Sequence, residues 1–231
     1  MKEMKALLFH VRGAMGHFRK VFSNSTSLSY YFPPRTTVMG MIAAAMGKER
    51  DRYYEELNQY EYSVSPLTGL RKLMFGETYL DTDNVDITSL RRLKQGVPTG
   101  REFVVPAGEE FLGYEVLVYP FNEIMMRNLR APAYPISLGP ANMLGWIEQV
   151  EEIQCEEFNS ISGKVNSVSS LKPEIEEDIR IAIEEMVPRA FDAGRHSGPL
   201  STYFLEIRGK PITVKGPAKG VRCKERNYLF L

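Results

Sequence analysis

Histidine, lysine and tyrosine side chains that could act on a phosphodiester lie close together near the N-terminus of this 231-residue chain. Metal-free RNA cleavage needs a base for the 2′-hydroxyl and an acid for the 5′ leaving oxygen, and histidine suits both roles near neutral pH. His17 lies in a glycine-punctuated turn, where Lys20 and Tyr30 or Tyr31 could assist it. A second interpretation, which we favour, is that His17 only contacts a phosphate or a base.

The same stretch has the composition of a phosphate-binding surface. Basic residues occur between positions 12 and 35 without a single acid, and the turn at residues 13–20 precedes a predicted helix. Free backbone N–H groups at such a turn and helix entrance can meet an anion. The candidate contacts are Arg12, Gly16, His17, Phe18, Arg19, Lys20, Arg35 and Thr36. A solvated loop whose glycines merely permit a tight turn is the alternative.

Aromatic residues interleave with these cations at Phe18, Phe22, Tyr30, Tyr31 and Phe32. Bases of single-stranded RNA stack on aromatic rings while cations hold the phosphates, although most aromatic residues simply belong to a core. A second basic cluster consists of Arg91, Arg92, Lys94 and Arg101. It falls on a polar stretch rich in turn residues, which predicts a loop or hairpin that leaves the core. Such an excursion could grip RNA or a partner subunit, or it could be a solvated loop.

Several classes of site are disfavoured by what the sequence lacks. The patterns GxxxxGK[ST] and GxGxxG are absent, which argues against nucleotide-driven chemistry. Cys155 and Cys223 lie far apart without a CxxC partner, so we expect neither a zinc site nor a disulfide framework. We expect no metal and no other cofactor. No apolar run has transmembrane length and the chain enters a strand-like run at once, so we expect a cytoplasmic protein without a membrane partner.

The overall charge is balanced, because Lys+Arg and Asp+Glu both number 29 and the formal net charge is zero. Proteins that bind nucleic acid freely and non-specifically are usually basic overall. The balance therefore argues against that class of protein, but it is compatible with a basic face. A weaker third basic run lies at residues 189–196.

Apolar periodicity predicts the elements that must position these side chains. Strands are predicted at residues 4–11, 61–64 (resuming through 70–75), 101–106, 111–119 and 146–158. Helices are predicted at residues 36–46, 51–60 and 122–129, the first apolar nearly all round and ended by Gly47. This order matches a split βαβ unit and predicts an α+β, ferredoxin-like fold related to the RRM. Two helices would cover one sheet face and leave the other for RNA, a second domain or a neighbour.

The last third of the chain has a weaker pattern. We predict a helix at residues 173–187 and a hairpin formed by residues 201–208 and 211–214 around Gly209 and Lys210. Residues 223–231 are expected to add one strand.

Five sequence runs, in a fixed order, resemble the signature of a known family. They are GHFRK at residues 16–20, YYFPPRTTVMGMIAAAMG at 30–47, TGREFVVP at 99–106, YPISLGPAN at 134–142 and VPRAFD at 187–192. The family is the CRISPR-associated Cas-five (Cas5) family, the small RAMP subunit of type I Cascade effector complexes. The type I-B branch is the most similar.

The resemblance implies both a fold and a role. The fold would be a ferredoxin-like domain at residues 1–158 with a protruding thumb hairpin at about residues 82–100, and a smaller β-rich part at residues 159–231. The role would be a crRNA-binding subunit in antiviral defence that holds the 5′ handle of crRNA and caps the backbone filament. Its partners would be the handle, the backbone (Cas-seven) subunit and the large (Cas-eight) subunit. The turn at residues 13–20 and the helix entrance at Arg35 would lie along the handle.

The resemblance also bears on catalysis. In the type I-C branch the family member cuts precursor crRNA with a tyrosine and an adjacent lysine and histidine, and no Lys-His pair occurs in this sequence. We therefore expect a non-catalytic subunit. The alternatives are a metal-independent endoribonuclease that uses His17, Tyr30 and Lys20, and an interaction subunit that contacts only proteins.

Overall fold

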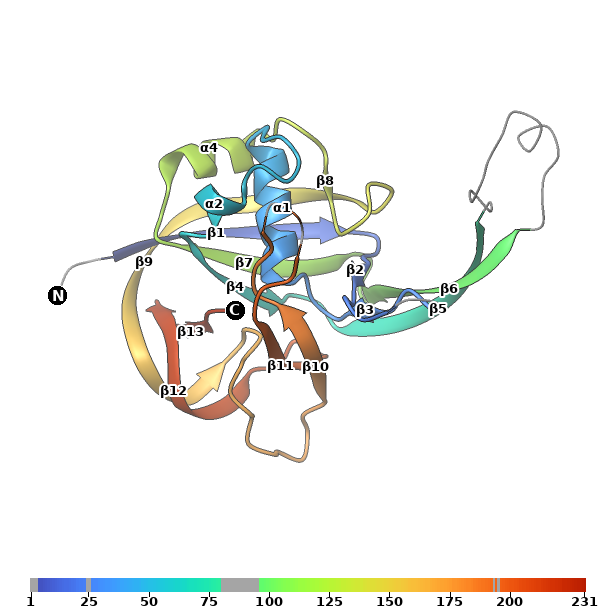
Figure 1. Cartoon of the computed structure of the whole chain (residues 1–231). Helices are drawn as coiled ribbons and strands as arrows, with labels where there is room; N and C mark the ends of the chain where they lie inside the picture. The colour runs from blue at the N-terminus through green and yellow to red at the C-terminus, as the bar shows by residue number, and fades with distance from the viewer. Residues whose placement is uncertain (1–3, 24–25, 80–95, 193, 195) are drawn as a thin grey trace.

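A curled antiparallel sheet with helices on one face forms the body of this α+β protein (Figure 1). The computed structural model describes residues 4–23, 26–79, 96–192, 194 and 196–231. The strands run in the order β13-β12-β9-β1-β7-β4, with β8 (Ile136–Ser137) paired to β9. Their bounds are β1 Met4–Gly13, β4 Glu61–Pro66, β7 Leu112–Tyr119, β9 Leu144–Val165, β12 Ile212–Cys223 and β13 Arg226–Leu229.

The two central strands are buried because both of their faces are covered. On β1, Leu7 and Phe9 belong to the core cluster that includes the residues of helix α1 (Arg35–Ala45). The alternate residues Ala6 and Leu8 belong to a second cluster on the opposite face. Burial on both faces explains why this strand reads as a continuous apolar run. On β7 every residue from Leu112 to Tyr119 is buried.

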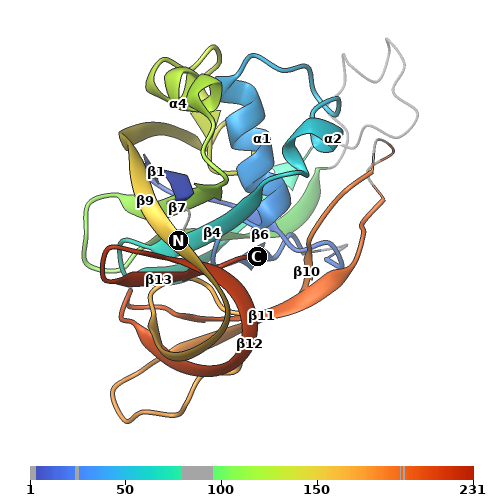
Figure 2. The same cartoon turned by 90° about the vertical axis from the view of Figure 1, so that its left-hand side faces the viewer.

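Helices α1 and α4 (Glu123–Arg130) cover the same face of the sheet (Figures 1 and 2). As predicted, α1 is almost wholly buried and is followed by Gly47 with a φ of +68°. The side chain of Asn122 caps α4 by accepting a hydrogen bond from the Met125 N–H at 2.8 Å. The helix predicted at residues 51–60 is only one turn, α2 (Tyr54–Leu57), because Asp51 has a left-handed φ of +65°. None of the helices in the described ranges is long and apolar enough to cross a bilayer.

Strand β9 joins the two ends of the chain into one curled sheet. Its 22 residues pair first with β1 and then with β12, so it runs without a break through the predicted boundary at residue 158. The C-terminal Leu231 donates its backbone N–H to Tyr62 on β4 at 2.9 Å, and Val168 donates to Val64 at 2.8 Å. The edge strand β4 is therefore partly covered rather than left open.

A two-stranded hairpin, which we call the arm, extends away from the body (Figure 1). It consists of β5 (Leu70–Tyr79) and β6 (Val97–Pro106), paired in register from Leu70 with Pro106 to Tyr79 with Val97. The sequence analysis predicted that residues 70–75 resume the strand that begins at residue 61. They begin the arm instead. Of the predicted excursion at about residues 82–100, residues 97–100 belong to β6, and residues 82–95 lie outside the described residues.

The C-terminal third departs from two predictions. Residues 173–187 are not helical: β10 (Ile181–Pro188) pairs with β11 (Leu200–Glu206) in a separate sheet. Isoleucine at positions 179, 181 and 183 alternates with period two, which is a strand pattern. The predicted hairpin around Gly209 is also wrong, because β11 pairs with β10 whereas β12 pairs with β9 and β13. The final strand is confirmed as β13.

The two cysteines form a disulfide, which corrects the expectation from their spacing. Cys155 and Cys223 are separated by 68 residues in sequence. Antiparallel pairing of β9 with β12 places Glu156 opposite Arg222, so the two cysteines are the next pair along the same ladder. Sequence distance alone could not reveal this register.

We predict that replacing both Cys155 and Cys223 by alanine lowers the free energy of unfolding. A native disulfide contributes roughly 2–4 kcal/mol, mainly by restricting the unfolded chain. Thermal denaturation of the wild-type and double variant checks the effect, and a thiol titration of the unfolded, unreduced protein checks the bond itself. Two reactive thiols in that titration would contradict the pairing.

Candidate nucleic-acid interface

The turn after β1 is held between the arm and the loop that follows β8. Gly16 exchanges both backbone hydrogen bonds with Val104 of β6, at 2.9 and 2.8 Å, and the His17 N–H donates to Leu138 at 2.9 Å. Gly139 has a φ of +109°, and a Cβ there would overlap the carbonyl oxygen of His17. The backbone N–H groups of Gly16 and His17 therefore have protein partners, and the sequence-based expectation that they meet an anion is wrong.

His17 is buried and both of its ring nitrogens are engaged. Nδ1–H donates to the Glu102 carbonyl oxygen at 2.7 Å, and the Ser27 hydroxyl donates to Nε2 at 3.0 Å. Burial lowers the pKa of His17, and the hydrogen bond to the Glu102 carbonyl opposes that shift only in part. In this arrangement the imidazole is neutral and links the turn to the arm through hydrogen bonds. Neither ring nitrogen is directed at a ligand.

Tyr30 and Lys20, the other two residues of the nuclease hypothesis, contact each other and not His17. Tyr30 is fully buried on β3 (Ser29–Tyr30), and its hydroxyl donates to the Met186 carbonyl oxygen at 2.6 Å. Burial raises the pKa of Tyr30 to about 12. Lys20 Nζ lies 5.4 Å from the centre of the Tyr30 ring and forms an ion pair with Glu184 at 2.5 Å.

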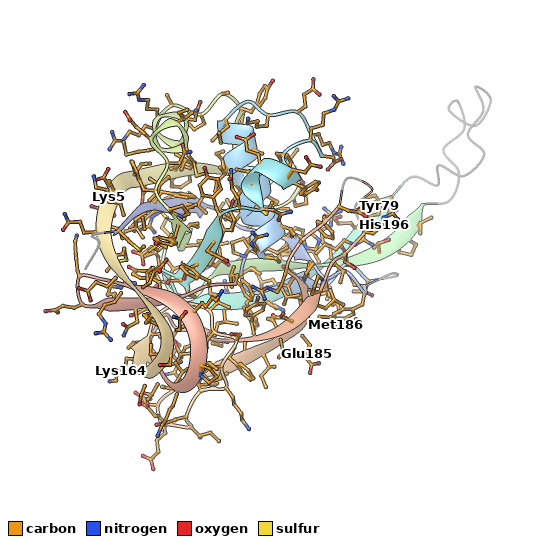
Figure 3. All side chains as sticks on the ribbon, turned by 60° about the vertical axis from the view of Figure 1, so that its left-hand side comes forward. Lys5, Tyr79, Lys164, Glu185, Met186 and His196 are labelled. Carbon is orange, nitrogen blue, oxygen red and sulfur yellow. A yellow bond between two sulfur atoms is a disulfide. The ribbon has the colours of Figure 1, made fainter. Side chains whose placement is uncertain are left out.

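An ionic network around one buried carboxylate, which sequence reasoning missed, connects three parts of the molecule. Glu184 on β10 is only 1% exposed, and it pairs with Lys20 from the turn and with Lys72 from β5. Lys72 also pairs with Glu102 of β6 at 3.2 Å. The Tyr31 N–H donates to Glu184 Oε1 at 3.0 Å. We call Lys20, Lys72, Glu102 and Glu184 the lysine–glutamate network. Figure 3 labels Glu185 and Met186, the next residues on β10.

Arg35 occupies a structural position at the start of α1. Its guanidinium donates to the Asn58 side chain at 2.7 Å and to the carbonyl oxygens of Asn58, Tyr60 and Arg189 at 2.9 to 3.0 Å. It also stacks over the Tyr62 ring at 5.1 Å. These contacts consume the donors that would otherwise meet phosphate, and burial lowers the pKa of Arg35. Thr36 and Phe18 are buried as well.

Only part of the predicted contact set reaches the surface of the described chain. Arg19 on β2 (Phe18–Arg19) is exposed and donates to the Ser23 carbonyl oxygen at 3.1 Å, and Phe22 nearby is 44% exposed. Arg12 forms an ion pair with Glu148, and Arg101 pairs with Glu77 at 3.2 Å. The remaining members of the second basic cluster, Arg91, Arg92 and Lys94, lie outside the described residues.

The far half of the described arm exposes apolar and aromatic side chains. They are Met74, Phe75, Tyr79 and Val97, each 40% exposed or more, and Tyr79 is labelled in Figure 3. Arg101 lies over the Tyr79 ring at 5.5 Å. Rings of this kind beside a cation can receive bases or a partner protein.

Comparison with known proteins decides the family. Residues 6–203 match the family described as CRISPR-associated protein (Cas_Cas5). The chain belongs to the Cas5 family. A crystal structure of a CRISPR protein from Archaeoglobus fulgidus is similar to this Cas5 chain over 98% of it and 99% of that protein, with a TM-score of 0.62 and 14% identity. A chain of a CRISPR RNA-guided surveillance complex is similar over 92% and 94%, with a TM-score of 0.54 and 17% identity. No curated protein sequence matches this one.

We predict that Arg35→Ala destabilises this Cas5 protein much more than Arg19→Ala does. Loss of the buried Arg35 leaves several carbonyl oxygens without a donor and should lower the free energy of unfolding by about 2 kcal/mol or more. Loss of the exposed Arg19 should change it by less than about 0.5 kcal/mol. Urea denaturation of both variants checks this, and equal destabilisation would contradict the assignment.

We predict that protonation of His17 lowers the free energy of unfolding in mild acid. Because its pKa is lower in the folded than in the unfolded state, the unfolded state binds more protons once the pH drops below about 6.5. The stability that His17 contributes is therefore complete above that pH and is lost as the pH falls toward the folded-state pKa. Urea denaturation of wild-type and His17→Gln protein from pH 8 to pH 5 checks this. Parallel stability profiles would contradict it.

Proposed function

We propose that this Cas5 chain is a non-catalytic crRNA-binding subunit of a type I Cascade effector complex. In that role it would hold the 5′ handle of crRNA and cap the backbone filament, next to the backbone (Cas-seven) and large (Cas-eight) subunits. Membership of the Cas5 family supports the proposal, as does the similar fold of a chain whose structure is named as an RNA-guided surveillance complex.

The main support for the proposal is that the family signature runs contact one another in the folded chain. The run at residues 16–20 contacts the run at 99–106 through Gly16 and Val104, and the run at 134–142 through His17 and Leu138. Arg35, from a fourth run, donates to the carbonyl oxygen of Arg189 in the fifth. These contacts support a common task for the signature, which is to set the position of the arm and of the exposed Arg19 loop.

Exposed residues on both features have the chemistry that single-stranded RNA requires. Arg19 offers an exposed cation in the loop that also exposes Phe22, and the arm exposes Phe75 and Tyr79. The less exposed Arg101 lies over the Tyr79 ring. Stacking of bases on rings and pairing of phosphates with cations gives binding that tolerates many sequences. In this proposal the arm corresponds to the family's thumb.

The strand order supports the ferredoxin-like assignment that belongs to this proposal. The four strands β9-β1-β7-β4 lie side by side, and helices α1 and α4 connect β1 to β4 and β7 to β9. This is the connectivity expected of a split βαβ unit. The second sheet face is partly covered by β12 and β13, which contribute Val221 and Tyr228 to the same buried cluster as Leu117.

The first test uses the purified chain, EDTA and labelled repeat RNA from its own CRISPR array. We expect a mobility shift without a cut, because the groups of His17, Tyr30 and Lys20 that would act on RNA already have protein partners. Arg19→Ala should weaken binding and reduce the steepness of its salt dependence by about one phosphate contact. Arg127→Ala on α4 is the matched control, since it also removes one exposed cation.

Each other result of this test has a definite meaning. A single defined cut would replace the binding subunit by the endoribonuclease alternative. Absence of any shift, together with binding to partner subunits alone, would favour the protein-only alternative.

A further inference from the structure

A groove at the base of the arm presents cations that neither the sequence motifs nor the family signature single out. It has a volume of about 530 Å³, and its lining includes the start of β5 and the residues that follow β11. Its lining includes Arg71 and Lys72 from the arm, Arg180 and Arg208 from the ends of the C-terminal strands, Tyr31 and Glu109. We call it the basal groove.

The walls of the basal groove are fixed by backbone hydrogen bonds between distant segments. The Leu70 N–H donates to the Ile207 carbonyl oxygen at 2.6 Å, and the Ile207 N–H donates to Arg180 at 3.0 Å. On the other side the Ala107 N–H donates to Gly69 at 2.8 Å. The arm and the β10–β11 sheet therefore meet in one defined geometry, and the groove is a built feature rather than a gap between loops.

A buried carboxylate positions two of the arginines. Glu206 is 3% exposed, and it accepts the backbone N–H groups of Arg180 at 3.0 Å and of Arg208 and Lys210 at 2.8 Å. Backbone donors satisfy this carboxylate, so it does not have to pair with a guanidinium. The chain segments on both sides of Glu206 are held in place, and their arginine side chains are directed outward from a rigid base.

The guanidinium groups of the groove are only weakly neutralised. Arg208 lies 3.7 Å from Asp178, but Lys210 holds the same carboxylate at 2.7 Å. Arg71 uses Nε for the Pro106 carbonyl oxygen at 3.3 Å, which leaves its two terminal nitrogens available to a ligand. Arg71 and Arg180 are exposed. Glu109, which accepts the Gly69 N–H at 3.2 Å, is the one acid among the described residues of the lining, against three arginines and Lys72. Lys72 is balanced by the lysine–glutamate network.

We propose that the basal groove binds phosphates of single-stranded RNA through Arg71, Arg180 and Arg208. Planar guanidinium groups pair with phosphate oxygens in a bidentate manner, and three of them around one groove can follow neighbouring phosphates of a strand. Tyr31 lines the same groove. This inference rests on the proposed function, because it assigns RNA a path from the Arg19 loop past the base of the arm.

The test compares the triple variant Arg71→Ala, Arg180→Ala, Arg208→Ala with a control that removes three exposed cations elsewhere, at Arg50, Arg127 and Lys164. Both changes alter net charge equally. With repeat-derived RNA we expect at least about tenfold weaker binding for the groove variant alone, and a salt dependence that is shallower by about two, since each contact to a single strand contributes roughly 0.7. Matching thermal midpoints of the two variants confirm that both are folded.

A chemical footprint keeps the proposal testable even if the triple variant does not fold. Phenylglyoxal modifies exposed arginines, and mass spectrometry of the wild-type protein with and without RNA reads each site. We expect RNA to protect Arg71, Arg180 and Arg208 and to leave Arg127 reactive. Equal modification with and without RNA would overturn the groove assignment while the wild-type mobility shift still supports RNA binding.

Two further outcomes separate this inference from the proposed function. If the wild-type protein binds no RNA, the proposed function fails first. If the groove variant binds RNA normally but no longer assembles with its partner subunits, the groove recognises an acidic protein segment and the RNA assignment is overturned.

Discussion

The burial of Glu184 is the constraint on which the rest of the structure depends. An ionised carboxylate that is 1% exposed is costly unless cations and hydrogen-bond donors surround it. Lys20 and Lys72 supply the charge and the Tyr31 N–H supplies a donor. These groups come from the turn, the arm and the segment before α1, while Glu184 itself comes from β10. Satisfying one carboxylate thus fixes the angle at which the arm leaves the body and the position of the C-terminal sheet beneath it.

Close approach of backbone segments, together with the ionic network, holds the turn against the arm and against the loop after β8. Gly16 lets the turn lie against β6, where a Cβ would meet the Phe18 ring at 2.9 Å, and Gly139 lets the loop after β8 lie on His17. The signature runs therefore serve mainly as a scaffold. Their most polar members, His17 and Arg35, hold segments together from inside, and exposed neighbours such as Arg19 are left to meet a ligand.

Local pattern was sufficient for the elements that stand out as apolar runs or amphipathic segments, and insufficient wherever pairing is long-range. Strands β1 and β7 and helices α1 and α4 follow from the spacing of apolar residues and, for α1, from a terminal glycine. The strand β10 was mistaken for a helix because Ile175, Ile179 and Ile183 are spaced four residues apart, which also fits a helix face, and because its partner strand lies across a loop. The disulfide depends on the register of β9 with β12. For the site, residue type identified Arg35 and His17 as important but could not show that their donors face inward.

Balanced composition does not prevent a surface from attracting an anion, because the acids of this chain are not distributed as its cations are. Glu102 and Glu184 are tied to lysines at the base of the arm, and Glu206 is satisfied by backbone N–H groups. Exposed charges more than about 8 to 10 Å apart are largely screened at physiological salt, so a strand of RNA responds to the nearest groups and not to the net charge. With these acids held in the scaffold, the cations in the described lining of the basal groove outnumber its single acid, Glu109. A chain of zero net charge can therefore present a local cationic path without becoming a general nucleic-acid binder.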